Sequence, residues 1–161
     1  AMWLSCIAFQ LKAQSYPPNL IGEWALVDWT ATSSIGEVLN PFGDDPLGRV
    51  FYTGEGSVVL VLMRSDRPLF ASDDPSERTL DEIEMAFHSF FTYTGRFEVN
   101  ANEAFIEHEV ELCSNPNWVG RTQTRYYELI GNTLVLTTPP IETTNTADEA
   151  VKHKLVWTKV H

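Results

Sequence analysis

The feature that most constrains the fold of this chain is a succession of short segments in which apolar and polar residues alternate. The alternation is clearest in residues 23–30, 104–113, 123–130 and 133–138, and a period of two is typical of a β-strand with one covered face. Turn-forming residues separate the segments at 54–56, 100–102 and 131–132. About eight such strands in sequence predict an all-β domain, an antiparallel up-and-down β-barrel whose closure removes exposed edge strands.

One segment has the periodicity of a helix instead. Its apolar residues fall at i, i+3, i+7 and i+10: Leu80, Ile83, Phe87 and Phe90. Thr79 and Glu82 have the spacing of a capping box, which places the start of the helix at Thr79. We therefore expect one inserted helix near residues 79–91. The polar loop before it, residues 64–78, contains two prolines and is suited to the mouth or lid of a barrel.

Charge and missing motifs exclude several function classes. The chain of 161 residues carries a formal net charge of -11, which disfavours nucleic acid and anionic membrane surfaces as partners. It contains no G-x-S-x-G elbow, P-loop, G-x-G-x-x-G or H-E-x-x-H motif. We expect neither a metal nor a cofactor, and an apolar small molecule is the expected partner.

The first residues and the cysteines bear on organisation and compartment. Residues 1–19 are expected to form an N-terminal arm and residues 20–161 a single barrel domain. The arm is too interrupted by polar residues for a membrane span and has no basic stretch typical of a secretory signal. Cys6 and Cys113 lack metal-ligand spacing, so free thiols in a reducing compartment, the cytoplasm, are expected.

Side-chain parity in residues 104–113 predicts an inward histidine. Glu107, Glu109 and Glu111 share one face, and three carboxylates in a row belong in water. The residues of opposite parity should therefore face the interior: Ile106, His108, Val110 and Leu112. An inward histidine is either a hydrogen-bonded core residue or part of a ligand site.

The same reasoning places an arginine inside. In residues 123–129 the face without Glu128 carries Gln123, Arg125, Tyr127 and Leu129. A buried arginine is costly unless it is paired or faces a polar ligand, and its charge together with burial would lower the pKa of a neighbouring histidine. His108 and Arg125 are therefore the candidate catalytic residues, with Gln123 and Tyr127 as ligand contacts. The alternative for Arg125 is a structural plug at a barrel end.

Other candidate ligand contacts each have a structural alternative. Arg64 lies either at the barrel mouth or in an ion pair with Asp66 or Asp28. Tyr52 and Tyr93 either direct hydroxyls into the cavity or form its wall. Trp118 either covers the cavity or covers a barrel end. Phe87, from the expected helix, is also a candidate ligand contact. Three histidines are not candidates: His88 is expected at the surface, and His153 and His161 have no visible partner.

Residues 20–160 resemble the lipocalin-like domain family. The resemblance rests on Gly22-Glu23-Trp24 in the first strand, on "PFGDDPLGRVFYTGEGSVVLVLMRSDRPLFAS", on "HEVELCSNPNWVGRTQTRYYEL" and on the closing "LVWTKV". It implies a small up-and-down barrel with an internal cavity. The matching motif positions are Arg64, Arg67, His108, Glu111, Trp118, Gln123 and Arg125. Cys113 stands where a serine is common in the group, which weakens any role carried over to that position.

The resemblance implies a function less directly than it implies a fold, because one fold can serve several functions. Some relatives act in natural-product pathways as cofactor-free cyclases or isomerases. The favoured hypothesis is such an enzyme, a cyclase, isomerase or dehydratase, in which His108 transfers a proton and Arg125 with Gln123 stabilises an enolate or alkoxide. It is favoured because a plain carrier needs no inward histidine and arginine pair. A second is a non-catalytic carrier or sequestering protein for an apolar molecule. A third is a structural protein whose apolar outer strand face forms a homodimer.

Overall fold

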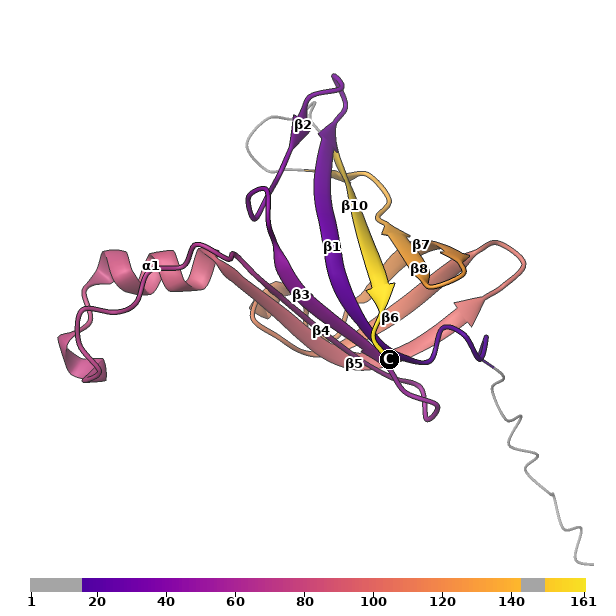
Figure 1. Ribbon diagram of the computed structural model, residues 1–161, viewed down its shortest axis with the longest axis horizontal. Helices are drawn as coiled ribbons and strands as arrows, with labels where there is room; N and C mark the ends of the chain where they lie inside the picture. Colours follow the sequence, from indigo (N-terminus) through magenta and orange to yellow (C-terminus); the bar gives the residue numbers. More distant parts are fainter. Residues whose placement is uncertain (1–15, 143–149) are drawn as a thin grey trace, which may run out of the picture.

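A computed structural model describes residues 16–142 and 150–161, and it confirms the antiparallel barrel. Ten strands form one sheet in the order β2-β1-β3-β4-β5-β6-β7-β8-β10-β9, and β1 also pairs with β10, which closes the barrel (Figure 1). The strands are β1 (Gly22–Ser33), β2 (Val38–Leu39), β3 (Leu47–Tyr52), β4 (Ser57–Met63), β5 (Phe90–Asn100), β6 (Phe105–Cys113), β7 (Thr122–Ile130), β8 (Thr133–Thr137), β9 (Ile141–Glu142) and β10 (Ala150–Lys159). Without the two-residue strands β2 and β9, the wall has the expected eight strands.

The predicted helix is present as α1 (Leu80–His88), and Thr79 caps it. The Thr79 side chain accepts from the Glu82 backbone N–H, and the Glu82 carboxylate accepts from the Thr79 backbone, so the capping box forms as expected. The apolar stripe of α1 does not enter the barrel core. Leu80 is 82% exposed and Phe87 is 54% exposed, because the loop and α1 extend away from the end of β4 and β5 (Figure 1).

An irregularity in β1 brings two tryptophans of opposite parity to the same side. The pairing of β1 with β10 shifts register between Leu26 and Asp28. On one side of the shift Trp24 is fully buried, and on the other Trp29 lines the interior cavity. A β-bulge changes which parity faces inward, so a single strand supplies tryptophans to both halves of the barrel.

A second bulge corrects one sequence expectation, the inward placement of Leu112. The β5–β6 register shifts between Thr94 and Gly95, so that Gly95 pairs with Val110 and Thr94 with Leu112. Leu112 is therefore 67% exposed, and Cys113 turns inward instead, opposite Tyr93. The strands approach closely here: a Cβ on Gly95 would lie 1.8 Å from the Glu109 carbonyl oxygen, so only glycine fits.

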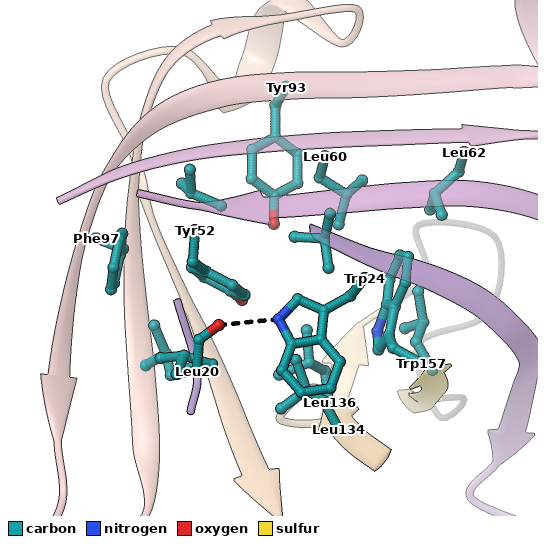
Figure 2. Packing of buried hydrophobic residues seen from close by; sticks show 14 of the residues in the cluster. Leu20, Trp24, Tyr52, Leu60, Leu62, Tyr93, Phe97, Leu134, Leu136 and Trp157 are labelled. Atoms are coloured by element: carbon teal, nitrogen blue, oxygen red, sulfur yellow. Dashed lines mark hydrogen bonds between the residues drawn. The ribbon is translucent and has the colours of Figure 1, made fainter. Parts of the chain in front are cut away.

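The closed end of the barrel is filled around Trp24. The indole Nε1 of Trp24 donates to the Leu20 carbonyl at 2.9 Å, as Figure 2 shows. The Lys159 ammonium lies 4.4 Å from the centre of the Trp24 ring. Gly22, with φ of 127°, has no Cβ to meet the Lys159 side chain. The Gly22-Glu23-Trp24 element is thus the plug of this end.

The expected N-terminal arm lies for the most part outside the described residues. Of its described part, Tyr16 packs its ring 4.4 Å from that of Phe97. Within residues 16–142 and 150–161, no helix is long and apolar enough to cross a membrane.

Candidate functional site

The half of the barrel around Trp29, below called the open half, contains a cavity of about 220 Å³. Its wall is mostly apolar and comes from β4, β5, β8, β9 and β10: Leu60, Leu62, Phe91, Leu136, Ile141 and Leu155. Two tryptophans, Trp29 and Trp118, complete the aromatic part of the lining. An apolar cavity with a few directed polar groups is the usual form of a small-molecule site.

The polar groups of the wall belong to Tyr93, Arg125, Thr138 and His153. All four carry hydrogen-bond donors. No acidic residue occurs among the described residues that line the cavity. The described lining therefore offers hydrogen-bond donors and one permanent positive charge.

His108 lies behind the cavity wall, fully buried. Its Nε2 is 3.0 Å from the Tyr52 hydroxyl and its Nδ1 is 2.7 Å from the Tyr93 hydroxyl. A neutral imidazole has one donor and one acceptor nitrogen, so one tyrosine accepts from it and the other donates to it. Tyr93 lines the cavity and Tyr52 does not. His108 can thus act on a ligand only through Tyr93.

Burial sets the protonation states of this group. It lowers the pKa of His108 well below the ordinary value, and the Arg125 charge lowers it further. Burial also raises the pKa of Tyr52 and Tyr93, which the Arg125 charge partly opposes. The histidine and both tyrosines are therefore neutral at neutral pH.

Arg125 is the buried charge of the cavity. It is 6% exposed, donates to the Thr124 carbonyl at 2.8 Å and lies 5.8 Å from the Trp118 ring centre. No carboxylate within residues 16–142 and 150–161 forms an ion pair with it. A buried guanidinium without a counter-ion is expensive to keep, which makes it the main energetic feature of the site.

His153 belongs to the site and was missed from sequence. Its Nδ1 accepts from the Trp29 indole at 3.2 Å, so the proton of the neutral ring sits on Nε2. Burial first, and then the Arg125 charge, lowers its pKa. The parity rule would have found it, because Lys152 and Lys154 flank it on the outer face while Leu155 shares its own. His161 also has a partner, Asn132, at 3.1 Å.

The orientation predicted for the β6 and β7 residues is confirmed where burial tests it. His108 and Arg125 are buried, and Glu107, Glu109 and Glu111 are all exposed. Gln123 pairs with His108 across the two strands and is half-buried. Of the residues expected to contact a ligand, the cavity wall contains Tyr93, Trp118 and Arg125. It does not contain Tyr52, Gln123 or Tyr127.

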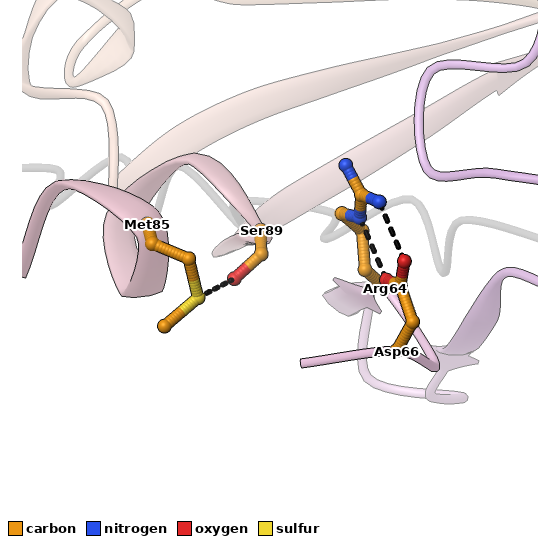
Figure 3. Close-up of polar contacts among 4 residues, drawn as sticks. All are labelled: Arg64, Asp66, Met85 and Ser89. Atoms are coloured by element: carbon orange, nitrogen blue, oxygen red, sulfur yellow. Dashed lines mark hydrogen bonds and ion pairs between the residues drawn. The ribbon is translucent and has the colours of Figure 1, made fainter. Parts of the chain in front are cut away.

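The two candidates nearest α1 lie outside the cavity. Arg64 forms a two-bond ion pair with Asp66, with nitrogen–oxygen distances of 2.8 and 2.7 Å (Figure 3). This is the structural alternative that the sequence left open for Arg64. Phe87 lines a separate outer hollow that shares Trp29 and Phe91 with the cavity. Phe87 is therefore not part of the cavity wall.

Within residues 16–142 and 150–161, no group of three or more His, Cys, Asp or Glu residues is placed to hold a metal ion. Cys113 is a free thiol, half-buried beside Tyr93. What the site offers is an apolar cavity with a cationic, donor-rich wall.

Comparison with known proteins places the fold in a family. The model of the lipocalin-like domain matches residues 21–160. The chain belongs to the lipocalin-like domain family. It is 34% identical over 84 residues to the 4'-hydroxy-3'-methoxypropiophenone carrier protein of Aspergillus oryzae, a match that covers 48% of this chain and 75% of the relative. A lipocalin-like protein from Bacteroides uniformis, known from a crystal structure, is 14% identical with a TM-score of 0.46, covering 88% of this chain and 99% of that one.

Proposed function

We propose that this lipocalin-like protein binds a small apolar molecule in the open half of its barrel and carries it unchanged. The observation that supports this most is the cavity itself, about 220 Å³ in volume and walled mostly by leucine and aromatic side chains. It is smaller than the ~300–1,000 Å³ typical of sites for drug-sized ligands. A single substituted aromatic ring is therefore the proposed size of the ligand.

The relative of Aspergillus oryzae, a carrier protein for a propiophenone, supports the carrier role and suggests an aryl ketone. Its named ligand, 4'-hydroxy-3'-methoxypropiophenone, is the natural first probe. Binding is measured by isothermal titration calorimetry, and Trp29 and Trp118 in the wall provide a fluorescence signal. One molecule per chain is expected.

A matched pair of variants locates the binding. Leu62→Trp fills the cavity, since Leu62 is 3% exposed and lines it, whereas Leu112→Trp adds the same side chain to the outer face. We expect Leu62→Trp to abolish binding and Leu112→Trp to retain it. Equal affinities for the two variants would place the ligand elsewhere and refute the proposal.

Proton-transfer catalysis, as in a cofactor-free cyclase or isomerase, is the second candidate function. It is favoured by the 2.7 Å contact between Tyr93, in the cavity wall, and Nδ1 of His108 behind it. A proton leaving the carbon next to a ketone would pass to the Tyr93 oxygen as the Tyr93 proton moves to His108. The resulting enolate would lie near Arg125.

The surroundings of His108 explain why the carrier function is preferred. The reaction would create an imidazolium at a fully buried position beside a cation, and burial and Arg125 both lower the pKa of His108. Such a weak base is poorly suited to removing a carbon-bound proton at neutral pH. Deuterium exchange next to the carbonyl of the bound propiophenone, followed by NMR, distinguishes the two functions. Exchange by wild type that Tyr93→Phe abolishes would establish catalysis, and unchanged ligand would leave the carrier.

A further inference from the structure

The cationic end of the cavity, Arg125 with Tyr93, has no counter-ion among the described residues. Arg125 is 6% exposed, and its hydrogen-bond partners are neutral: the Thr124 backbone carbonyl and the Tyr93 hydroxyl, whose pKa this hydrogen bond lowers against the larger effect of burial. A guanidinium carries several N–H donors in a planar fork that matches two acceptor oxygens or one anionic oxygen. Arg125 lines the cavity, so the N–H donors that Thr124 and Tyr93 do not use are available to a ligand.

Among the described residues, no other group around Arg125 supplies a compensating negative charge. The titratable side chains that sense its charge come from four strands: Tyr52 of β3, Tyr93 of β5, His108 of β6 and His153 of β10. Both tyrosines are neutral phenols and both histidines neutral imidazoles at neutral pH. The positive charge of Arg125 is therefore unbalanced within the described part of the barrel.

The neighbouring strands strengthen the same preference. Tyr126 pairs with Thr137, so Thr138 is level with Arg125, and Thr138 is in turn hydrogen-bonded to His153 of β10. The His153 ring accepts from Trp29 at Nδ1, which leaves the Nε2 proton as a donor. Thr138 accepts from the His153 backbone N–H at 3.0 Å through its hydroxyl oxygen, and its own hydroxyl proton remains to be donated. Acceptor groups on a ligand would therefore find further donors beside Arg125, whereas a ligand cation would meet the positive charge of Arg125.

We propose that the ligand carries an acidic oxygen, a phenol or an enolisable carbonyl, and is bound as the anion with that oxygen on Arg125. This rests on the proposed binding function and names the chemical class that the cavity selects. The ligand would complete the charge balance of the barrel, with its oxyanion on the guanidinium and its ring among the leucine and aromatic side chains. A neutral ring of the same size would bind through the apolar wall alone.

A pair of single-ring probes tests this: 4-nitrophenol, whose anion is yellow, and 4-nitroanisole, its methyl ether, which cannot ionise. The absorbance of 4-nitrophenol is titrated against pH with saturating wild-type protein. We expect the bound phenol to ionise at least about one pH unit lower than the free phenol, which corresponds to roughly tenfold tighter binding of the anion than of the neutral form. A bound phenol that ionises at the same pH as free phenol, or higher, would overturn the proposal.

Variants at Arg125 identify the cause. In Arg125→Met the ionisation shift should disappear while 4-nitroanisole binds within about threefold of wild type, and Arg125→Lys should retain part of the shift. If Arg125→Met does not fold, the wild-type titration and Arg125→Lys still decide the matter. A full shift in Arg125→Met would overturn the assignment to this residue. If neither probe binds wild type, the binding function fails as well, whereas binding of both without a shift rejects only the anion preference.

Discussion

The closed half of the barrel, around Trp24 and His108, differs from the open half, around Trp29 and His153, in how its polar groups find partners. In the closed half the Trp24 indole and both nitrogens of His108 are paired with protein atoms, and the buried Trp157 indole Nε1 is the exception. In the open half Trp29 and His153 pair with each other, while Arg125 lines the cavity and has no counter-ion within the described part of the chain. The closed half thus contributes stability, and the open half keeps polar capacity for a ligand.

The largest expected effect separates the two tryptophans of β1. Trp24→Ala empties a fully buried site and should lower the free energy of unfolding by about 3–5 kcal/mol. Trp29→Ala enlarges an existing cavity at a half-buried position and should cost roughly half as much or less. Urea unfolding followed by circular dichroism measures both, and equal losses would show that the two halves are not energetically distinct.

The next effect separates the two inward histidines. His108→Leu leaves the hydroxyls of Tyr52 and Tyr93 without their partner in a buried site, which should cost about 2 kcal/mol or more. His153→Leu leaves only the Trp29 indole N–H unpaired, beside a cavity that water can enter, and should cost less than about 1 kcal/mol. The same unfolding experiment provides the comparison. A larger loss of unfolding free energy in His153→Leu than in His108→Leu would show that His153, and not His108, contributes more to stability.

The pH dependence of stability sharpens the comparison further. The folded pKa values of His108 and His153 are both lowered, so below the unfolded value near 6.5 the unfolded chain binds more protons than the folded chain. Stability should therefore be complete above about pH 6.5 and fall with decreasing pH, by up to about 1.4 kcal/mol per pH unit for each histidine.

Replacement of the more buried histidine isolates its share of this loss. The His108→Gln side chain can still hydrogen-bond to both tyrosines. In this variant the free energy of unfolding should decline less steeply between about pH 6 and 5, because close to one proton fewer is taken up on unfolding. Urea midpoints at three pH values suffice for the measurement. An unchanged slope would mean that His108 is protonated in the folded barrel, contrary to its burial.

The smallest expected effect concerns Arg64, which the sequence placed among the ligand contacts. Its ion pair with Asp66 is exposed and outside the cavity, and exposed pairs contribute little because water and salt screen them. Arg64→Ala should leave both the melting temperature and the affinity for the propiophenone probe unchanged. A marked loss of affinity would bring the loop before α1 into the site.

The strands, the helix cap and the inward direction of His108 and Arg125 were predictable because each depends on local sequence. Parity follows from the pleat of one strand, and the capping box depends on Thr79 and Glu82 alone. Closure of the barrel was predicted from the need to avoid exposed edge strands, and the resemblance to lipocalin-like domains implied the same barrel. These predictions concern single strands and the ends of elements, and contacts between distant segments change such local features little.

The remainder depended on contacts between strands that no local pattern reports. The bulge opposite Gly95 moved Leu112 outside, and the shift in β1 brought Trp29 inside. The parity rule would have placed His153 inside, but its hydrogen bond with Trp29, 124 residues away in the sequence, could not be predicted from a local pattern. Parity predicts which side chains point inward but not how close they lie to the cavity. It therefore placed both His108 and Arg125 inside without showing that only Arg125 lines the cavity. The catalytic and ligand-contact roles themselves remain predictions.

The glutamate row on the outer face of β6 has a kinetic consequence. Glu107, Glu109 and Glu111 contribute to a net charge of -11, so an anion approaching the barrel is repelled before it meets Arg125 inside. Added salt screens the long-range repulsion, with a Debye length of about 10 Å at 0.1 M, but hardly reaches the buried contact. The association rate of an anionic ligand should thus rise with ionic strength while its residence time stays nearly constant, the reverse of ordinary electrostatic steering.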